Sequence, residues 1–217
     1  MTLVCFVVAI IAYLIGSINF SVILSKKMAG FDVREKGSGN AGTTNMLRSV
    51  GKKAAAITLI CDILKGVVAI GLALLIAKIF NAQNKALLVQ IAGIFVVVGH
   101  TFPVFFGFKG GKGVATSLGI LIMSNWEIGL ICLAVGVALI AITKMVSVGS
   151  CFAAILFAVL TFFIKDNYIT TEGTEYYVYG VVLAIFILIN HRSNIVRLIQ
   201  GKENKISFKS KKTNEEK

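Results

Sequence analysis

The chain has 217 residues, of which 57% are hydrophobic and only 15% charged, and its mean hydropathy is +0.86. Soluble domains carry about 25% charged residues, so this composition excludes an ordinary soluble globular protein and predicts an integral-membrane one. The net charge of +12 does not indicate nucleic-acid binding, because most lysines and arginines lie in short polar segments and in the tail, where membrane proteins carry their cytoplasmic charge.

Apolar runs alternate with short polar segments along the chain. They cover residues 3–24, 54–76, 86–106, 114–123, 128–143, 146–164 and 176–190. The longest approach the ~20 apolar residues that a helix needs to cross a bilayer. The N-terminus lacks the basic start and small-residue cleavage site of a secretory signal peptide, so we expect 3–24 to be a retained first span. The sequence therefore predicts an all-α, polytopic membrane protein with about seven transmembrane helices.

The distribution of basic residues predicts the orientation. They concentrate between Lys26 and Lys53, around Lys112, and after His191, and the positive-inside rule places all three segments in the cytoplasm. This requires a break in 114–143 at Ser124-Asn125-Trp126-Glu127. The N-terminus and the acidic segment 165–175 (Asp166, Glu172, Glu175) then lie outside, and the C-terminus is cytoplasmic.

Run 114–123 leaves an alternative open. Its ten residues cover about 15 Å as a helix, against ~30 Å of hydrocarbon. A re-entrant hairpin with five full spans would keep the same orientation. We expect residues 1–204 to form one integral-membrane domain, and residues 205–217 to be a polar, disordered cytoplasmic tail.

The segment Gly107 to Thr116 carries the clearest functional signal, with four glycines and two lysines between apolar runs. Glycines let backbone N–H groups point at an anion, and Lys112 supplies charge. A helix starting near Val114 adds the positive end of its dipole. This is not a Walker A loop, because Gly113 follows the lysine where that motif needs Ser or Thr, so no nucleotide is implied. Taken alone, a basic glycine-rich turn is also ordinary in a cytoplasmic loop.

Two further polar clusters fall on the same predicted side. The first runs from Ser38 to Lys53 and the last from Asn190 to Arg197, where His191 shares a helix face with Asn194. Three such clusters on one face indicate a site for phosphorylated molecules at the membrane surface. Metal and cofactors are not expected, because the chain has two histidines and its cysteines (Cys5, Cys61, Cys132, Cys151) are far apart in apolar segments.

Two pairs inside predicted spans have plainer explanations. Asp62 and Lys65 are three residues apart, and ionised groups at that depth are costly unless they are paired. We expect an internal ion pair that braces the site rather than a catalytic pair. Ser147 and Ser150 have the same spacing; Ser150 is the candidate to face the site, although simple helix packing explains it equally well.

Three strings together point to a known family. They are Gly37-Ser38-Gly39-Asn40 with Thr44-Asn45 and Arg48; Gly99-His100-Thr101-Phe102-Pro103 with Phe108-Lys109-Gly110-Gly111-Lys112-Gly113-Val114-Ala115-Thr116; and His191-Arg192-x-Asn194-Ile195-x-Arg197-Leu198 with Gly201-x-Glu203. They closely resemble the PlsY-type family of bacterial integral-membrane glycerol-3-phosphate acyltransferases, over nearly the whole chain. The chain departs from the family at Thr43, where a small residue is usual, and at Asn190, where arginine is common.

The resemblance implies transfer of a fatty acyl group from acyl phosphate to the 1-hydroxyl of glycerol 3-phosphate. The products are 1-acyl-glycerol 3-phosphate (lysophosphatidate) and phosphate, in bacterial phospholipid biosynthesis. It implies no cofactor, a site facing the cytoplasm, and a bacterial inner or plasma membrane as the location. The His-x4-Asp pattern of acyltransferases that use thioesters is absent at His100 and His191, which fits a different donor.

In addition to the Asp62–Lys65 ion pair, the expected site residues fall into two groups by role. The catalytic candidates are Ser38, Arg48, Lys112, His191 and Asn194. The substrate-binding candidates are Asn40, Thr44, Gly110, Gly111, Gly113, Thr116, Ser150 and Arg192. The sequence leaves open whether His191 is a base or only orients substrate, which acyl chain is preferred, and the oligomeric state.

A membrane carrier of a phosphorylated solute is the alternative function. It would also need charges at the midplane and anion sites at helix ends. Polar clusters on one side only, and the lack of an inverted repeat in the sequence, favour the enzyme.

Overall fold

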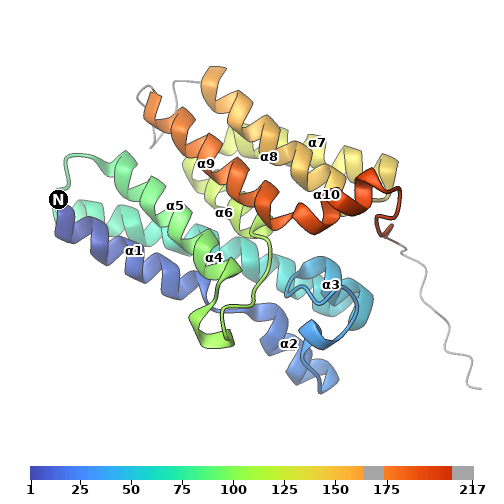
Figure 1. Cartoon of the computed structure of the whole chain (residues 1–217). Coiled ribbons are helices and arrows are strands. Elements are labelled where there is room, and N and C mark those ends of the chain that lie inside the picture. The colour runs from blue at the N-terminus through green and yellow to red at the C-terminus, as the bar shows by residue number, and fades with distance from the viewer. Residues whose placement is uncertain (164–173, 207–217) are drawn as a thin grey trace, which may run out of the picture.

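A computed structural model of the chain describes residues 1–163 and 174–206, and the regular elements in these ranges are all helical (Figure 1). In chain order they are α1 (Thr2–Gly16), α2 (Phe20–Ala29), the 3₁₀ turn η1 (Val33–Glu35), α3 (Thr43–Ser49), α4 (Lys52–Ile79), α5 (Lys85–Thr101), the 3₁₀ turn η2 (Val104–Phe106), α6 (Val114–Ser124), α7 (Trp126–Thr143), α8 (Val146–Phe163), α9 (Thr174–Asn190) and α10 (Arg192–Ile199). The predicted all-α class is confirmed. Asp166 and Glu172, expected on the external side, and the tail beyond 206 lie outside the described residues.

Several of these helices are long and apolar enough to cross a membrane. Within the described ranges five helical stretches meet that description: Thr2–Ala29, Lys52–Ile79, Lys85–Phe106, Trp126–Thr143 and Val146–Phe163. The α9–α10 pair, bent by 64°, would make a sixth. Helix α6 has 11 residues and is about 16 Å long. The protein is therefore a multi-pass membrane protein.

The first predicted span is broken in the structure, because 3–24 is divided between α1 and α2. Asn19 caps α2, and its Oδ1 accepts a hydrogen bond from the Val22 N–H at 3.2 Å. The break leaves the Gly16 and Ile18 carbonyls without helical partners, and the ammonium of Lys65 donates to both, at 3.1 and 3.2 Å. A charged side chain from α4 therefore stabilises the interruption.

The helices form two groups joined by α6. Helices α1, α4 and α5 pack together, and α7, α8 and α9 lie side by side on the other side of the molecule (Figure 1). Helix α6 contacts both groups, through α4 and α5 on one side and α7 on the other. Small residues permit the closest approaches: a Cβ on Gly119 of α6 would clash with the Ile63 carbonyl of α4.

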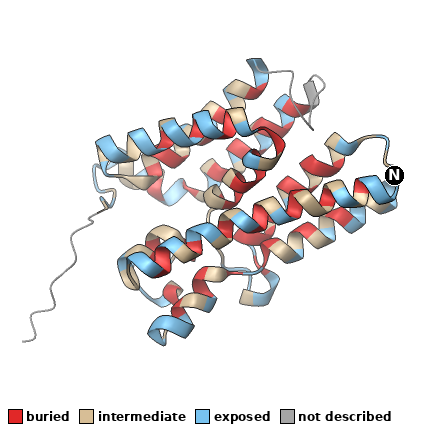
Figure 2. Ribbon diagram, turned by 180° about the vertical axis from the view of Figure 1, so that it is seen from behind, coloured by how far each residue is buried: buried red, intermediate tan, exposed pale blue. Residues whose placement is uncertain are grey.

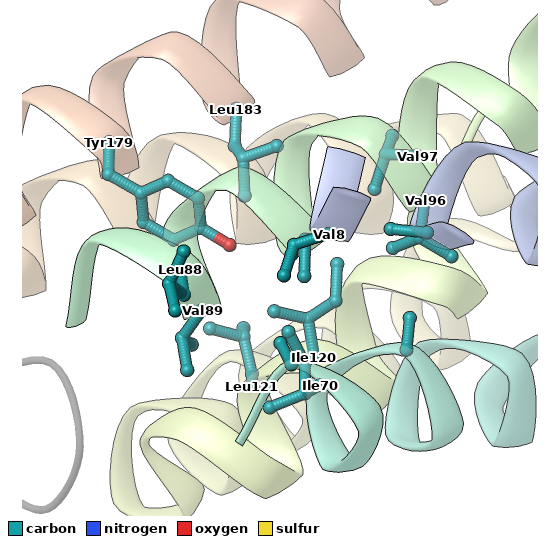
Figure 3. Close-up of a cluster of buried hydrophobic side chains, with 14 of the residues drawn as sticks. Val8, Ile70, Leu88, Val89, Val96, Val97, Ile120, Leu121, Tyr179 and Leu183 are labelled. Carbon is teal, nitrogen blue, oxygen red and sulfur yellow. The ribbon is translucent and has the colours of Figure 1, made fainter. Parts of the chain in front are cut away.

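Buried apolar side chains fill the space between the helices, and apolar side chains also cover much of the outside. Figure 3 shows the main cluster, where Val8, Ile70, Val96, Ile120 and Leu183 meet from α1, α4, α5, α6 and α9. Figure 2 shows buried residues on the surfaces where helices face each other and exposed ones on the outer faces. Many exposed side chains are large and apolar, as expected where lipid tails are the solvent.

Candidate active site

A cavity of about 820 Å³ lies between the two helix groups. Its polar lining comes from the segment before α3, from α3 itself, from Asp62 of α4 and His100 of α5, and from the ends of α6, α8, α9 and α10. The predicted site residues among its lining are Ser38, Asn40, Thr44, Arg48, Asp62, Lys112, Gly113, Ser150, His191, Arg192 and Asn194. The interiors of α6, α7, α8 and α9 supply an apolar lining that includes Leu121, Val137 and Phe157. The three polar clusters of the sequence therefore converge on one cavity with an apolar extension.

Lys112 connects the second and third clusters. Its Nζ donates to Oδ1 of Asn194, whose Nδ2 donates to Oε1 of Glu203 at 2.7 Å. The other Glu203 oxygen accepts from Nε of Arg197 at 3.0 Å. Burial lowers the pKa of Lys112 to about 8, although the nearby Glu203 carboxylate opposes that shift. The lysine is thus a cation at neutral pH that loses its charge only slightly above it.

Arg48 reaches the same region from α3. It lines the cavity, and its guanidinium donates to the Asn204 carbonyl at 3.4 Å. Partial burial lowers its pKa, but an arginine remains charged at any physiological pH. Arg48 and Lys112 together supply the cavity with two cations from distant segments.

The first cluster is organised by Asn45, which the sequence reasoning did not assign a role. Asn45 is 1% exposed. Its Oδ1 accepts from the Ser38 N–H at 2.9 Å, and its Nδ2 donates to the carbonyls of Val33 and Lys36 at 2.8 and 3.0 Å. A Cβ on Gly37, where φ is +60°, would clash with Asn45. Asn45 therefore fixes the turn that presents Ser38 to the cavity.

Arg34 ties the first cluster to the second, a role the sequence also did not reveal. Its Nη1 donates to the carbonyls of Phe106 and Lys109, at 2.6 and 3.1 Å. Its Nε and Nη2 hold both carboxylate oxygens of Asp32, at 3.0 and 2.8 Å, and these hydrogen bonds lower the pKa of Asp32. The pair thereby joins two loops that are about 70 residues apart in sequence.

The structure changes one part of the prediction for the glycine-rich loop. The N–H groups of Gly110 and Gly111 donate to the carbonyls of Thr101 and His100, each at 3.0 Å, so they are not available to an anion. These carbonyls end α5 and lack helical partners, which is why the loop folds back onto them. Gly110 and Gly111 are absent from the cavity lining, as is Thr116, whose carbonyl packs against Gly66 of α4.

The backbone N–H groups that suit an anion lie further along the chain, at the start of α6. Gly113, with φ +88°, lines the cavity together with Val114 and Ala115. The first backbone hydrogen bond of α6 runs from Ser117 to the Gly113 carbonyl at 2.8 Å. The preceding N–H groups of the first turn have no carbonyl within the helix, and the dipole adds positive potential there.

Asp62 and Lys65 form the ion pair, with Nζ 2.9 Å from Oδ1 and both side chains buried. A third partner, His100, was missed, because the sequence analysis considered it only for metal binding and for the His-x4-Asp pattern. Its Nδ1 lies 2.7 Å from Lys65 Nζ and 3.5 Å from Asp62 Oδ1. Asp62 and His100 line the cavity. The buried pair therefore reaches the cavity both directly, through Asp62, and through His100.

His191 stands at the bend between α9 and α10. Its Nδ1 is 2.8 Å from the Ile187 carbonyl, and a carbonyl can only accept, so the neutral ring carries its proton on Nδ1 and a lone pair on Nε2. Asn194 follows one turn later and joins the Lys112 network. Ser150, the predicted candidate on α8, lines the cavity, and so does Ser147, to which the sequence assigned no role.

Comparisons with known proteins bear on this site. The glycerol-3-phosphate acyltransferase family matches residues 6–201. Proteins called glycerol-3-phosphate acyltransferase from Thermoanaerobacter pseudethanolicus and Clostridioides difficile are 46% and 42% identical, over 93% and 94% of this chain and 96% of each relative. A crystal structure of PlsY, an integral membrane glycerol 3-phosphate acyltransferase, in its glycerol 3-phosphate form is 34% identical, with a TM-score of 0.82 over 94% of this chain and 96% of that one. Its lysophosphatidic acid form is 33% identical, with a TM-score of 0.79 over 94% and 95%.

Proposed function

The chain belongs to the glycerol-3-phosphate acyltransferase family, and from this premise we propose how its cavity carries out the reaction. The protein is an acyltransferase that transfers a fatty acyl chain to glycerol 3-phosphate and so forms lysophosphatidate. The observation that carries the mechanism is a cavity in which Lys112 and Arg48 lie at one end of an apolar channel lined by α6, α7, α8 and α9. Such a cavity suits a reaction between a small anion and a long acyl chain.

The proposed orientation has seven crossings, with the N-terminus outside and the cavity open to the cytoplasm of a bacterial plasma membrane. The crossings are α1–α2, α4, α5, α6, α7, α8 and α9, with α10 at the cytoplasmic surface. The basic segments support this orientation through the positive-inside rule. The contacts of α6 with α4, α5 and α7 support a short helix shielded by protein rather than by lipid. Because both helix groups line one cavity, residues 1–204 act as one domain.

The glycerol 3-phosphate site of the proposal lies at the start of α6. Lys112 and Arg48 neutralise the phosphate, and the free N–H groups after Gly113 donate to its oxygens. Gly110 and Gly111 act indirectly, because they let the loop pack close to α5 and so place Lys112. Ser150 and Arg192 also line the cavity, and in this proposal they contact the glycerol or phosphate groups.

Acyl phosphate is the proposed donor, with its chain in the apolar channel and its phosphate near the first and third clusters. Ser38, Asn40 and Thr44 supply hydrogen-bond donors from one side. His191 and Asn194 supply polar contacts from the other. Holding both substrates in this way provides orientation, which is a large part of catalysis between two bound molecules.

Transfer then proceeds in one step. The 1-hydroxyl oxygen of glycerol 3-phosphate attacks the acyl carbon, the carbon–oxygen bond to the donor phosphate breaks, and phosphate leaves. The hydroxyl proton passes to an oxygen of the donor phosphate, which is doubly charged near neutral pH. His191, with its Nε2 lone pair, orients the attacking hydroxyl, and the cations stabilise the leaving charge. The rival mechanisms make His191 the base or Ser38 an acylated nucleophile.

The function is tested with purified protein and acyl phosphate. Phosphate release that depends on added glycerol 3-phosphate, with lysophosphatidate as the second product, is the expected result. A carrier of a phosphorylated solute would instead accumulate glycerol 3-phosphate inside sealed vesicles without releasing phosphate from the donor. That outcome would contradict the enzymatic proposal and support a carrier.

A further inference from the structure

We propose that His100 is a positioning residue. The buried Asp62–Lys65 pair holds it in one neutral tautomer, and its ring then sets the backbone of Gly111 and with it the place of Lys112. The inference rests on the proposed function in one respect, namely that Lys112 binds glycerol 3-phosphate. The contacts that support the positioning role join residues of α4, α5 and the loop before α6.

The ion pair determines where the ring proton lies. Lys65 Nζ is 2.7 Å from Nδ1 of His100, and an ammonium group can only donate, so Nδ1 must accept and the proton must be on Nε2. Asp62 Oδ1 lies 2.9 Å from the same ammonium group, and the side chains of Asp62, Lys65 and His100 are only 3%, 2% and 5% exposed. The ring is therefore held by two partners that are themselves buried.

The ring in turn supports the glycine-rich loop. A Cβ on Gly111 would clash with Nε2 of His100, so the imidazole edge lies directly against that backbone. The Gly111 N–H also donates to the His100 carbonyl at 3.0 Å. The next residue is Lys112, which lines the cavity and contacts Asn194. Any displacement of the ring is thus transmitted to Lys112 across a single peptide unit.

The tautomer is tested without reference to activity. The chain has two histidines, so protein labelled with ¹⁵N-histidine gives two ring systems, and a His191→Asn variant assigns them. Long-range ¹H–¹⁵N spectra should show His100 protonated on Nε2 alone and His191 protonated on Nδ1. A His100 ring protonated on Nδ1, or on both nitrogens, would overturn the proposal.

The positioning role is tested by a double-mutant cycle. His100→Ala should raise the KM for glycerol 3-phosphate about tenfold or more, because small misplacements of binding groups have large effects, while the KM for acyl phosphate stays close to that of the native protein. Gly111→Ala adds a methyl group that would meet both the His100 ring and the Ala41 carbonyl. In the double variant the clash with the ring is relieved and the clash with Ala41 remains, so the double variant should be less impaired than the sum of the two changes.

Gly110→Ala is the matched control, because its Cβ would meet the backbone carbonyl of His100 rather than its ring. Its effect should add to that of His100→Ala. Additive behaviour at Gly111 as well, or equal changes in both KM values, would overturn the positioning role. A native protein that forms no lysophosphatidate would contradict the proposed function instead, and the tautomer measurement would still decide whether the ion pair fixes His100.

Discussion

The pH dependence of glycerol 3-phosphate use should report the ionisation of Lys112. Burial lowers the pKa of this lysine to about 8, so its cation is present at pH 7 and is lost as the pH rises through 8. At pH 9 only about a tenth of the free enzyme would carry the charge, and kcat/KM for glycerol 3-phosphate should be about tenfold below its plateau. The substrate phosphate does not change charge in this range, since its second pKa is near 6.

The assay is a set of initial rates at saturating acyl phosphate, with glycerol 3-phosphate varied between pH 6.5 and 9.5. Lys112→Arg replaces the lysine with a cation that stays charged, so the alkaline limb should disappear even if the plateau is lower. Lys109→Arg is the control, because Lys109 lies in the same loop but is exposed and outside the cavity lining. A native profile that is flat to pH 9.5, or an unchanged limb in Lys112→Arg, would refute the assignment of Lys112.

The other predictions concern the loop, the first cluster and the orientation. Gly111→Ala should raise the KM for glycerol 3-phosphate while the protein still inserts, since its Cβ would meet the His100 ring and the Ala41 carbonyl; an unchanged KM would remove the loop from the site. Asn45→Ala removes three hydrogen bonds of a buried side chain and should lower the unfolding free energy by about 2–3 kcal/mol, measured by denaturation in detergent, with a raised KM for acyl phosphate. Single cysteines at positions 38, 112 and 191, in a protein without its native cysteines, should react with an impermeant thiol reagent only from the cytoplasmic side, and one at 172 only from outside; the reverse at 172 would contradict the orientation.

The sequence predicted those features that depend on local composition. Apolar runs identified α4 to α9, although they did not show the division of the first run into α1 and α2. The polar clusters around Ser38, Lys112 and His191 identified three parts of the cavity lining. Such signals are visible in sequence because each is carried by neighbouring residues: charge and glycine interrupt an apolar run, and a helix must end there. The convergence of the clusters also followed from charge, since the positive-inside rule assigned them to one face.

The features that the sequence did not show depend on contacts between residues far apart in the chain. The break between α1 and α2 is stabilised by Lys65, 49 and 47 residues from the carbonyls it binds. His100 acquires its role from the same lysine, 35 residues away. The expected N–H cradle at Gly110 and Gly111 failed because the end of α5 takes those donors. Nothing local distinguishes a glycine that frees an N–H group from one that allows close packing.

The central claim is that one cavity brings the two phosphates together for direct acyl transfer, and a quenched-flow experiment with acyl-labelled acyl phosphate tests it most directly. With glycerol 3-phosphate present, the label should appear in lysophosphatidate in equal amount to the phosphate released. Without it, neither free phosphate nor labelled protein should form. An acyl adduct on Ser38, or phosphate release that does not need glycerol 3-phosphate, would contradict the account.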